Sequence, residues 1–266
     1  MKIRFVAHSG FYLELPELNL LFDYYRGPLP EPEPEKPLLV FVSHAHADHF
    51  SPRIFALSQR VQRIRYVISD DVSQRDVPEE LRSRVSFMGP REQLCFRLPR
   101  HEEAGEIVQL PVTREMPAPG GKSNEICIRS FRSTDEGVAY MVDAGGRRIY
   151  HAGDLNDWHW DEEDSPWNEA QRRGYETELC AMAELIGRDG HIPDAAFVPL
   201  DTRLGDGRFF WMGLDEYMKQ VGAQHIFPMH LFGDPAVIQK MRELPCAADY
   251  AERILGTGTE GEEFII

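Results

Sequence analysis

The residues with the clearest chemical potential form one short string, Ser43-His44-Ala45-His46-Ala47-Asp48-His49. It directly follows the apolar run 38–42, which is typical of a strand buried on both faces. In an extended segment His44 and His46 point the same way, so both imidazoles can reach one metal ion. Asp48 and His49 fall where the chain turns and can reach a second ion. Three imidazoles and a carboxylate are ligands that zinc prefers in hydrolytic sites. The alternative, a solvated His-rich turn, leaves the preceding apolar run unexplained.

Two later residues stand just beyond expected strands. Asp154 stands in Tyr150-His151-Ala152-Gly153-Asp154, just after an expected hairpin. His230 stands in Phe227-Pro228-Met229-His230, at the end of an expected strand. By residue type alone they could be a turn-capping aspartate and a histidine buried in the core.

The order strand, His-x-His-x-Asp-His, Gly-Asp and terminal His resembles the metallo-β-lactamase-fold hydrolases over nearly the whole chain. It most resembles the branch that includes the ascorbate-6-phosphate lactonase-like proteins, usually called Zn-dependent hydrolases. The resemblance implies an α/β fold of the αββα sandwich type, with two β-sheets flanked by helices in a single domain, residues 1–266. It also implies a dinuclear site at one edge. There the first-site ligands would be His44 and His46. The second-site ligands would be Asp48, His49 and His230, Asp154 would bridge the two ions, and Asp48 and Asp154 would be catalytic.

The chain departs from the family pattern at the third first-site ligand, which is usually a histidine before the Gly-Asp pair. The histidines in that interval are His101, in a charged stretch, and His151, close to the Gly-Asp pair itself. At the expected place stands Ser-Thr-Asp-Glu-Gly, residues 133–137. We therefore expect Asp135 to be the ligand, with Thr134 or Glu136 as alternatives, and a turn aspartate as the competing interpretation.

The expected cofactors are two divalent metal ions, zinc first, with manganese or iron as alternatives. If Asp135 is a ligand, three carboxylates and a bridging hydroxide neutralise the four positive charges of two such ions. A site richer in oxygen shifts the metal preference from zinc toward manganese or iron.

A second set of residues could shape a substrate pocket beside the metals. His8 lies at the first turn, and Trp158 and His159 closely follow Asp154. Asp201 and Arg203 end a later strand, where Arg203 could bind a carboxylate or phosphate or pair with Asp201. The residues His101, His191 and His225 carry no pattern, and strand alternation predicts that His151 faces away from Asp154.

The elements that must position these residues change in character along the chain. Short apolar runs predict strands at 3–6, 12–15, 20–23, 38–43, 65–69, 85–88, 107–112, 125–131, 138–143 and 147–151. Apolar spacings of three and four predict a helix over 51–64, and the prolines of 29–37 predict a stiff surface loop. Helices over 167–187, 214–222 and 235–244 then alternate with strands at 195–200, 225–228 and the chain end. A strand-rich half followed by an alternating half predicts two sheets between helices.

Composition narrows the partners. The net charge is 29 − 44 = −15, which repels phosphate backbones, so we expect a small-molecule substrate and no nucleic acid. No apolar run is long enough to span a membrane, and the N-terminus lacks the apolar core of a signal peptide, so a cytoplasmic location without membrane partners is expected. The cysteines, Cys95, Cys127, Cys180 and Cys246, form no C-x-x-C pair and are expected as reduced, buried thiols.

We therefore expect a metal-dependent hydrolase of the metallo-β-lactamase superfamily, in which a metal-bridging hydroxide cleaves a small ester, lactone or related substrate. One alternative is a phosphodiesterase of the same fold, which the net charge disfavours. Another is a non-catalytic metal-binding or sensor module, in which Asp135 marks a degenerate first site. A redox di-iron protein of this fold would carry a glutamate in place of His46, which the sequence lacks.

Overall fold

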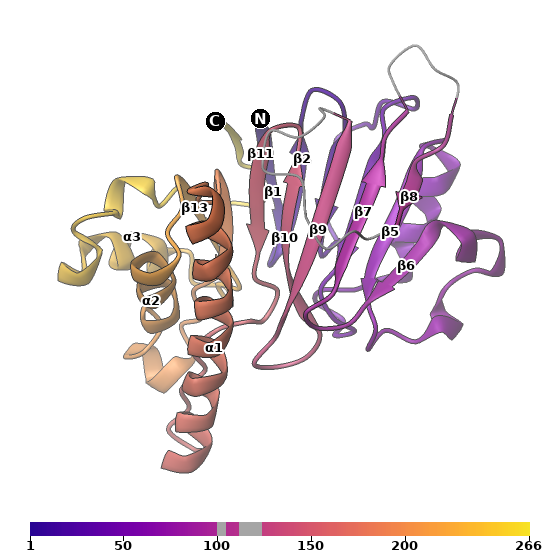
Figure 1. The fold of residues 1–266 in the computed structure, drawn as a ribbon. Helices are drawn as coiled ribbons and strands as arrows, with labels where there is room; N and C mark the ends of the chain where they lie inside the picture. Colours follow the sequence, from indigo (N-terminus) through magenta and orange to yellow (C-terminus); the bar gives the residue numbers. More distant parts are fainter. Residues whose placement is uncertain (100–104, 112–123) are drawn as a thin grey trace.

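The computed structural model describes residues 1–99, 105–111 and 124–266, and in these ranges the strands form two seven-stranded sheets (Figure 1). The first sheet has the order β14-β1-β2-β3-β4-β5-β6 and the second β13-β12-β11-β10-β9-β7-β8. The strands of the first sheet are β1 (Lys2–Ala7), β2 (Gly10–Glu14), β3 (Asn19–Phe22), β4 (Leu38–Val42), β5 (Ile64–Ser69), β6 (Val85–Met88) and β14 (Glu263–Ile265). Those of the second are β7 (Gln93–Arg97), β8 (Val108–Leu110), β9 (Glu125–Arg132), β10 (Val138–Ala144), β11 (Arg147–His151), β12 (Ala195–Pro199) and β13 (His225–Met229).

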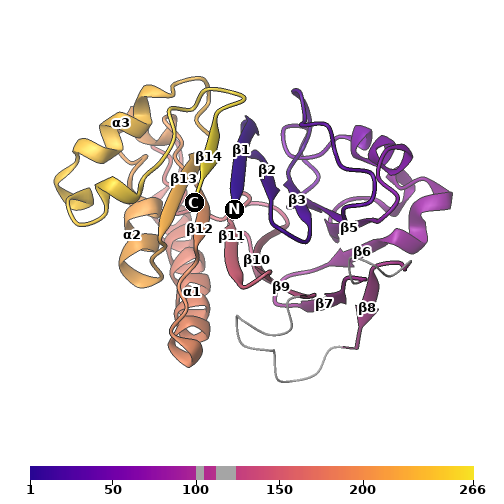
Figure 2. The same cartoon turned by 90° about the horizontal axis from the view of Figure 1, so that it is seen from above.

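Helices flank the two sheets on both outer sides. Figure 2 shows the helices α1 (Ser165–Asp189), α2 (Met212–Gln220) and α3 (Ala236–Glu243) outside the second sheet. On the opposite side, 3₁₀ segments cover the first sheet: η1 (Pro52–Gln59), η2 (Gln74–Asp76) and η3 (Glu79–Arg84). Shorter 3₁₀ turns are η4 (Leu204–Gly207), η5 (Pro245–Ala247) and η6 (Ala251–Arg253). The predicted sandwich of two sheets between helices is confirmed.

The strand that leads into the histidine string is buried on both faces, as its unbroken apolar run predicts. Leu39 and Phe41 of β4 point into the core between the two sheets, and Phe41 stacks on Phe22 of β3 at 4.6 Å. Val40 and Val42 point outward into a second apolar cluster under η1. Because every side chain of β4 is packed, the loop that follows starts from a fixed point.

The longest helix, α1, has a well-defined beginning and end. The Asp164 side chain accepts a hydrogen bond from the Trp167 N–H at 2.9 Å, and the helix stops at Gly190, whose φ of +71° is left-handed. Leu179 and Met182 on its buried face join the central core. Like the other helices of the described ranges, α1 is not apolar enough to cross a membrane.

One predicted helix is wrong, and one strand was missed. The helix expected over 51–64 is the shorter 3₁₀ segment η1, because residue Ile64 is taken up by pairing with Leu38 in the sheet. Strand β7 was not predicted at all, since only three apolar residues lie between its polar ends. The strand expected at 107–112 spans Val108–Leu110, and residue 112 lies outside the described ranges.

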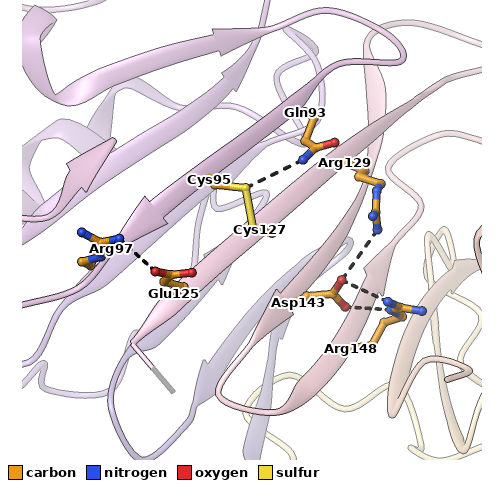
Figure 3. Close-up of a disulfide and its surroundings, with 8 residues drawn as sticks. All are labelled: Gln93, Cys95, Arg97, Glu125, Cys127, Arg129, Asp143 and Arg148. Carbon is orange, nitrogen blue, oxygen red and sulfur yellow. Dashed lines mark hydrogen bonds and ion pairs between the residues drawn. A yellow bond between two sulfur atoms is a disulfide. The ribbon is translucent and has the colours of Figure 1, made fainter. Parts of the chain in front are cut away.

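The expectation of four reduced, buried thiols is also wrong. Cys95 on β7 and Cys127 on β9 are direct partners in the antiparallel pair and form a disulfide, with Cα atoms 4.3 Å apart (Figure 3). Cys180 is exposed on α1, and Cys246 is half-buried. The register between strands decides which cysteines face each other, and this register cannot be derived from the spacing of the cysteines along the chain.

Candidate metal centre

One edge of the sandwich collects the chemically active residues of both sheets. In the first sheet β1 and β3 both run antiparallel to β2, and β4 runs parallel to β3, so their C-terminal ends lie together. In the second sheet β11, β12 and β13 are parallel and end at one edge as well. The residues that follow these six strands are His8, Asp23, the string 43–49, Asp154, Asp201 and His230. Ligand sites in open α/β sheets form at such carboxyl ends.

The histidine string divides into a buried and an exposed part. His44 and His49 are fully buried, with ring centroids 4.0 Å apart. His46 is 47% exposed and lies at the rim, its ring 4.7 Å from that of His44. The string thus presents imidazoles both at the bottom of the site and at its opening.

Asp154 lies at the centre of these imidazoles. Its Oδ1 is 3.2 Å from His49 Nε2 and 3.5 Å from His230 Nε2, and its Oδ2 is 3.6 Å from His44 Nε2. The turn before it is Gly153, with φ +52°, where a Cβ would lie 2.6 Å from Ser43 Cβ. Only glycine allows the two strand ends to approach so closely. The two oxygens of one carboxylate therefore face different histidines, as a bridging ligand requires.

Asp135 lies near the exposed histidine. Its Oδ2 is 3.9 Å from His46 Nδ1, and Glu136 Oε2 is 3.5 Å from His46 Nε2. Ligand atoms of His46, Asp135 and Asp154 all lie within 4.8 Å of one another. The alternative Thr134 is engaged instead in holding the loop, since its hydroxyl donates to Asn156 O at 2.6 Å and accepts from Asn156 N–H. The geometry thus keeps Asp135 and Glu136 available, and Asp135 is the one grouped with Asp154.

Gly137 brings this loop against the histidine string. Its φ is +68°, and a Cβ there would lie 2.0 Å from Ser43 O and 2.6 Å from His44 Cβ. The next N–H, that of Val138, donates to Ser43 O at 2.9 Å. A side chain at residue 137 would push the Asp135 loop away from His44.

A second group surrounds His230. Ligand atoms of His8, Asp48, His49 and His230 all lie within 4.8 Å of one another, and His8 Nε2 is 3.3 Å from Asp48 Oδ2. His8 therefore lies among the predicted second-site ligands and not only in the pocket wall.

Buried carboxylates hold two of the imidazoles through Nδ1, and a buried hydroxyl holds a third. Asp23 Oδ2 accepts from His49 Nδ1 at 2.8 Å, and Asp201 Oδ2 accepts from His230 Nδ1 at 3.1 Å. The Ser43 hydroxyl donates its one hydrogen to Asp23 at 2.6 Å, so His44 Nδ1, 2.9 Å away, must donate to Ser43 Oγ. In each case Nδ1 carries the hydrogen, which leaves Nε2 free to act as a ligand.

Asp23 and Ser43 were not recognised as site residues from the sequence. A charged residue at the end of the apolar strand 20–23 was the available signal. His151 is also closer than expected: its Nδ1 lies 3.9 Å from Asp23 Oδ2, although Nδ1 accepts from Gly153 N–H and Nε2 donates to Ser9 O. With both nitrogens engaged, His151 supports the site and does not face it as a ligand.

The donor atoms fit a metal ion. His44 Nε2, His49 Nε2, His8 Nε2 and Asp154 Oδ1 are all buried and lack a hydrogen-bond partner in the described residues. Bare imidazole nitrogens facing a carboxylate are all acceptors and repel one another unless a proton or a cation lies between them. Donors about 2.0–2.1 Å from one ion in a tetrahedron lie about 3.3 Å apart, which is the spacing found around Asp154.

Without an ion, protons must take this place. Burial would lower the pKa of His230, but the neighbouring Asp154 and Asp201 carboxylates raise it to about 9. Burial and the proximity of His49 lower the pKa of His44 to about 4, so this imidazole stays neutral. Metal binding here would displace a proton from His230.

A cavity of about 260 Å³ opens beside the donors. Trp158, Trp160, Trp167 and Phe232 form its apolar walls, and Gln171 and Arg203 add polar groups. Trp158 is fixed by donating from Nε1 to Asp154 O at 2.9 Å. Trp167, Gln171 and Phe232 were not anticipated from the sequence, because α1 and the turn after β13 reach the site only in the folded chain.

The other expected pocket residues have different surroundings. Arg203 donates from Nε and Nη2 to Asp201, and its guanidinium lies 3.3 Å above the Phe232 ring centroid. Asp201 is fully buried and holds His230, so it positions a ligand and does not line the cavity. His159 packs on Phe209 and lines a neighbouring cavity instead. Of the patternless histidines, His101 lies outside the described residues.

Known proteins resemble this chain in sequence and in fold. The family model described as Beta-lactamase superfamily domain matches residues 20–231, a range that excludes His8. Two relatives named UPF0173 metal-dependent hydrolase, from Opitutus terrae and Methanocorpusculum labreanum, are 28% and 26% identical to this chain. The alignments cover 89% and 91% of this chain and 87% and 88% of the relatives. A solved metallo hydrolase of the archaeon Ignicoccus hospitalis, 15% identical, covers 100% of this chain and 98% of its own with a TM-score of 0.56, which indicates a shared fold.

Proposed function

The chain belongs to the beta-lactamase superfamily and is a metal-dependent hydrolase, and we propose that it holds two divalent ions and cleaves a small ester or lactone. The observation that supports a two-ion site is the placement of Asp154. Its Oδ1 faces His49 and His230 while its Oδ2 faces His44, so one carboxylate can bind two ions and reduce their repulsion.

The residues divide between two ions in this proposal. His44, His46 and Asp135 would hold the first ion, and Asp48, His49 and His230 the second, with Asp154 shared between them. His46 and Asp135 lie in one group with Asp154, and His44 lies in another with His49 and Asp154. Asp48, His49 and His230 lie together in a third group. Divalent ions supply Lewis acidity, which lowers the pKa of water and polarises a carbonyl oxygen. Zinc is the first choice for the imidazole-rich second site, and the carboxylate of Asp135 makes manganese or iron acceptable in the first.

The cavity supports a small substrate with an apolar part and an anionic part. The cavity of about 260 Å³ is slightly smaller than the roughly 300–1,000 Å³ of typical small-molecule sites, and indole rings form much of its wall. Arg203 donates from Nε and Nη2 to Asp201. Within the described residues its Nη1 has no hydrogen-bond partner, so Nη1 can donate to a carboxylate or phosphate of the substrate. Gln171 Oε1 is buried, has no hydrogen-bond partner in the described part of the chain, and offers an acceptor. A cyclic ester with an acidic substituent, as in the lactonase-like branch that the sequence resembles, satisfies all three features.

The rim of the site disfavours a phosphodiesterase acting on long substrates. Asp48, Asp135 and Glu136 are 41–55% exposed around the opening, and their charges repel a polyphosphate backbone. The sensor alternative is disfavoured because Asp135 and His46 are still within reach of Asp154.

The proposal is tested by metal analysis together with turnover. The wild-type protein, reloaded with zinc or manganese, should bind two ions and hydrolyse a nitrophenyl ester or a small lactone faster than bis-nitrophenyl phosphate. Asp154→Ala should lose at least about 100-fold in turnover with an unchanged circular dichroism spectrum, since it removes a ligand of both ions. Asp249→Ala, at an exposed position, is the matched control.

Each contrary result has a definite meaning. Wild-type turnover by metal-loaded Asp154→Ala would reject Asp154 as the bridge. At most one ion without turnover would favour the sensor module, and preferred cleavage of the phosphate diester would favour the phosphodiesterase.

A further inference from the structure

His8, expected from the sequence only to shape the pocket, is built into the metal edge by its backbone. It lies in the turn between β1 and β2 with a φ of +54°, a left-handed conformation that side chains with a Cβ rarely adopt. His230 has a φ of +62° as well, and its N–H donates to His8 O at 3.2 Å. Two strained histidines from different sheets are thus tied together, and strain of this kind is found at functional sites.

The side chain of His8 points at the second group of donors. Its Nε2 lies 3.3 Å from Asp48 Oδ2, the edge expected between two ligands of one tetrahedral ion. Its ring centroid is 4.4 Å from that of His230 and 5.4 Å from that of His49. His8 Nε2 is buried and has no hydrogen-bond partner among the described residues.

We propose that His8 binds the second ion through Nε2 and that the second site is therefore the tighter of the two. This rests on the proposed two-ion function. The second ion then has three imidazoles, from His8, His49 and His230, with the carboxylate of Asp48 completing a closed set before Asp154 is counted. Closed sets of this kind hold zinc firmly, whereas catalytic sites keep an open position.

The first site has the opposite character. His46 and Asp135 are each nearly half exposed and border the cavity, so this ion is open to solvent and substrate. The first site has the carboxylate of Asp135 where the family pattern that the sequence resembles has an imidazole, whereas His8 adds an imidazole to the second set. Because imidazole suits zinc better than carboxylate does, zinc should prefer the second site.

The competing explanation is that His8 only positions Asp48. Hydrogen bonds do not distinguish the two explanations, because His8 Nδ1 has no hydrogen-bond partner in the described part of the chain. The ring is held by aromatic contacts with Tyr25, Phe232 and His230. The two explanations differ in what a change at His8 does to the metal itself.

The experiment titrates metal-free protein with zinc against a chelating dye, and with cobalt while recording visible absorption. His8→Asn keeps a residue that tolerates the left-handed backbone but is too short to place a donor at Nε2. The substitution should lower the affinity of the tighter zinc site by at least about 10-fold and leave the affinity of the weaker site unchanged. The cobalt spectrum at one equivalent should change as well. His191→Asn, a histidine outside the metal groups, is the matched control.

His8→Gly provides an independent variant, because glycine adopts this backbone without strain. Added imidazole should restore both the tight affinity and the cobalt spectrum. Unchanged affinity and spectrum in both variants would overturn the role of His8 while leaving a two-ion hydrolase intact. A wild-type protein that binds no ion tightly would overturn the proposed function together with this inference.

Discussion

Changing Asp23 to Asn should weaken the second metal site without changing the shape of the protein. Asp23 is fully buried behind the histidine string and has a φ of +43°. Asparagine adopts this conformation as readily as aspartate, so the substitution replaces one oxygen by an amide nitrogen and little else.

The effect follows from the hydrogen bonds of the two oxygens. Asp23 Oδ1 accepts from Ser43 N–H at 2.7 Å, and this bond keeps the amide oxygen of an asparagine in the same place. The new NH₂ group then faces His49 Nδ1 across 2.8 Å, and two donors cannot share that contact. His49 has to move its hydrogen to Nε2, the atom that faces Asp154, and Nε2 can no longer bind an ion. The Ser43 hydroxyl, which donates to the same oxygen, has to accept from the NH₂ group and turn its hydrogen toward His44 Nδ1, so the first site is disturbed as well.

The loss of such a supporting carboxylate typically costs 10–100-fold in metal affinity, and we expect about that loss at the second site. Ser43→Ala is the informative companion. It leaves the Asp23–His49 bond in place but removes the oxygen that accepts from His44 Nδ1, so it should weaken the first site instead.

Competitive zinc titration of the three proteins measures both affinities, and the ¹⁵N spectrum of the His49 ring reports which nitrogen carries the hydrogen. Wild-type affinity of the second site in Asp23→Asn, or weakening of the second site by Ser43→Ala, would refute this assignment of tautomers.

Three further outcomes are expected. Asp135→His should raise the affinity for zinc relative to manganese and lower the apparent pKa of the pH–rate profile, because the substitution removes one negative charge beside the ions. An unchanged ratio of zinc to manganese affinity would exclude Asp135 as a ligand. The unfolding free energy of the metal-free protein should fall by on the order of 3 kcal/mol as the pH rises from about 6.5 through about 9, because the raised pKa of His230 stabilises the fold only while its imidazolium is paired with Asp154 and Asp201. Urea denaturation at several pH values measures this fall, and Asp201→Asn should make the pH dependence weaker. Burial raises the pKa of Asp157 to about 6, so the folded state loses stability as the pH rises from about 4 to about 6. Asp157→Asn should therefore stabilise the protein by up to about 3 kcal/mol at pH 8 but not at pH 4. An equal gain in stability at both pH values would show that ionisation of Asp157 is not the cause.

The sequence by itself determined the elements and residues whose information is local. The run 38–42 reads as a doubly buried strand because all five of its residues are apolar, and β4 is buried on both faces. The histidine string follows that strand in the chain, so His44, His46 and His49 had to share one loop. Asp154 and His230 were assigned through the resemblance to the metallo-β-lactamase-fold pattern, in which a Gly-Asp pair and a later histidine follow the histidine string.

Tertiary structure alone decided which distant residues join them. The sequence expected His8 beside the pocket, but its position next to Asp48 and His230, and the whole contribution of Asp23, follow from the pairing of β1 and β3 with β2. The same holds for Cys95 and Cys127, which strand register places opposite each other, and for Trp167 and Gln171, which α1 brings to the cavity. Periodicity reports how a segment is exposed to its immediate surroundings, whereas contacts between segments depend on register and packing across the whole core.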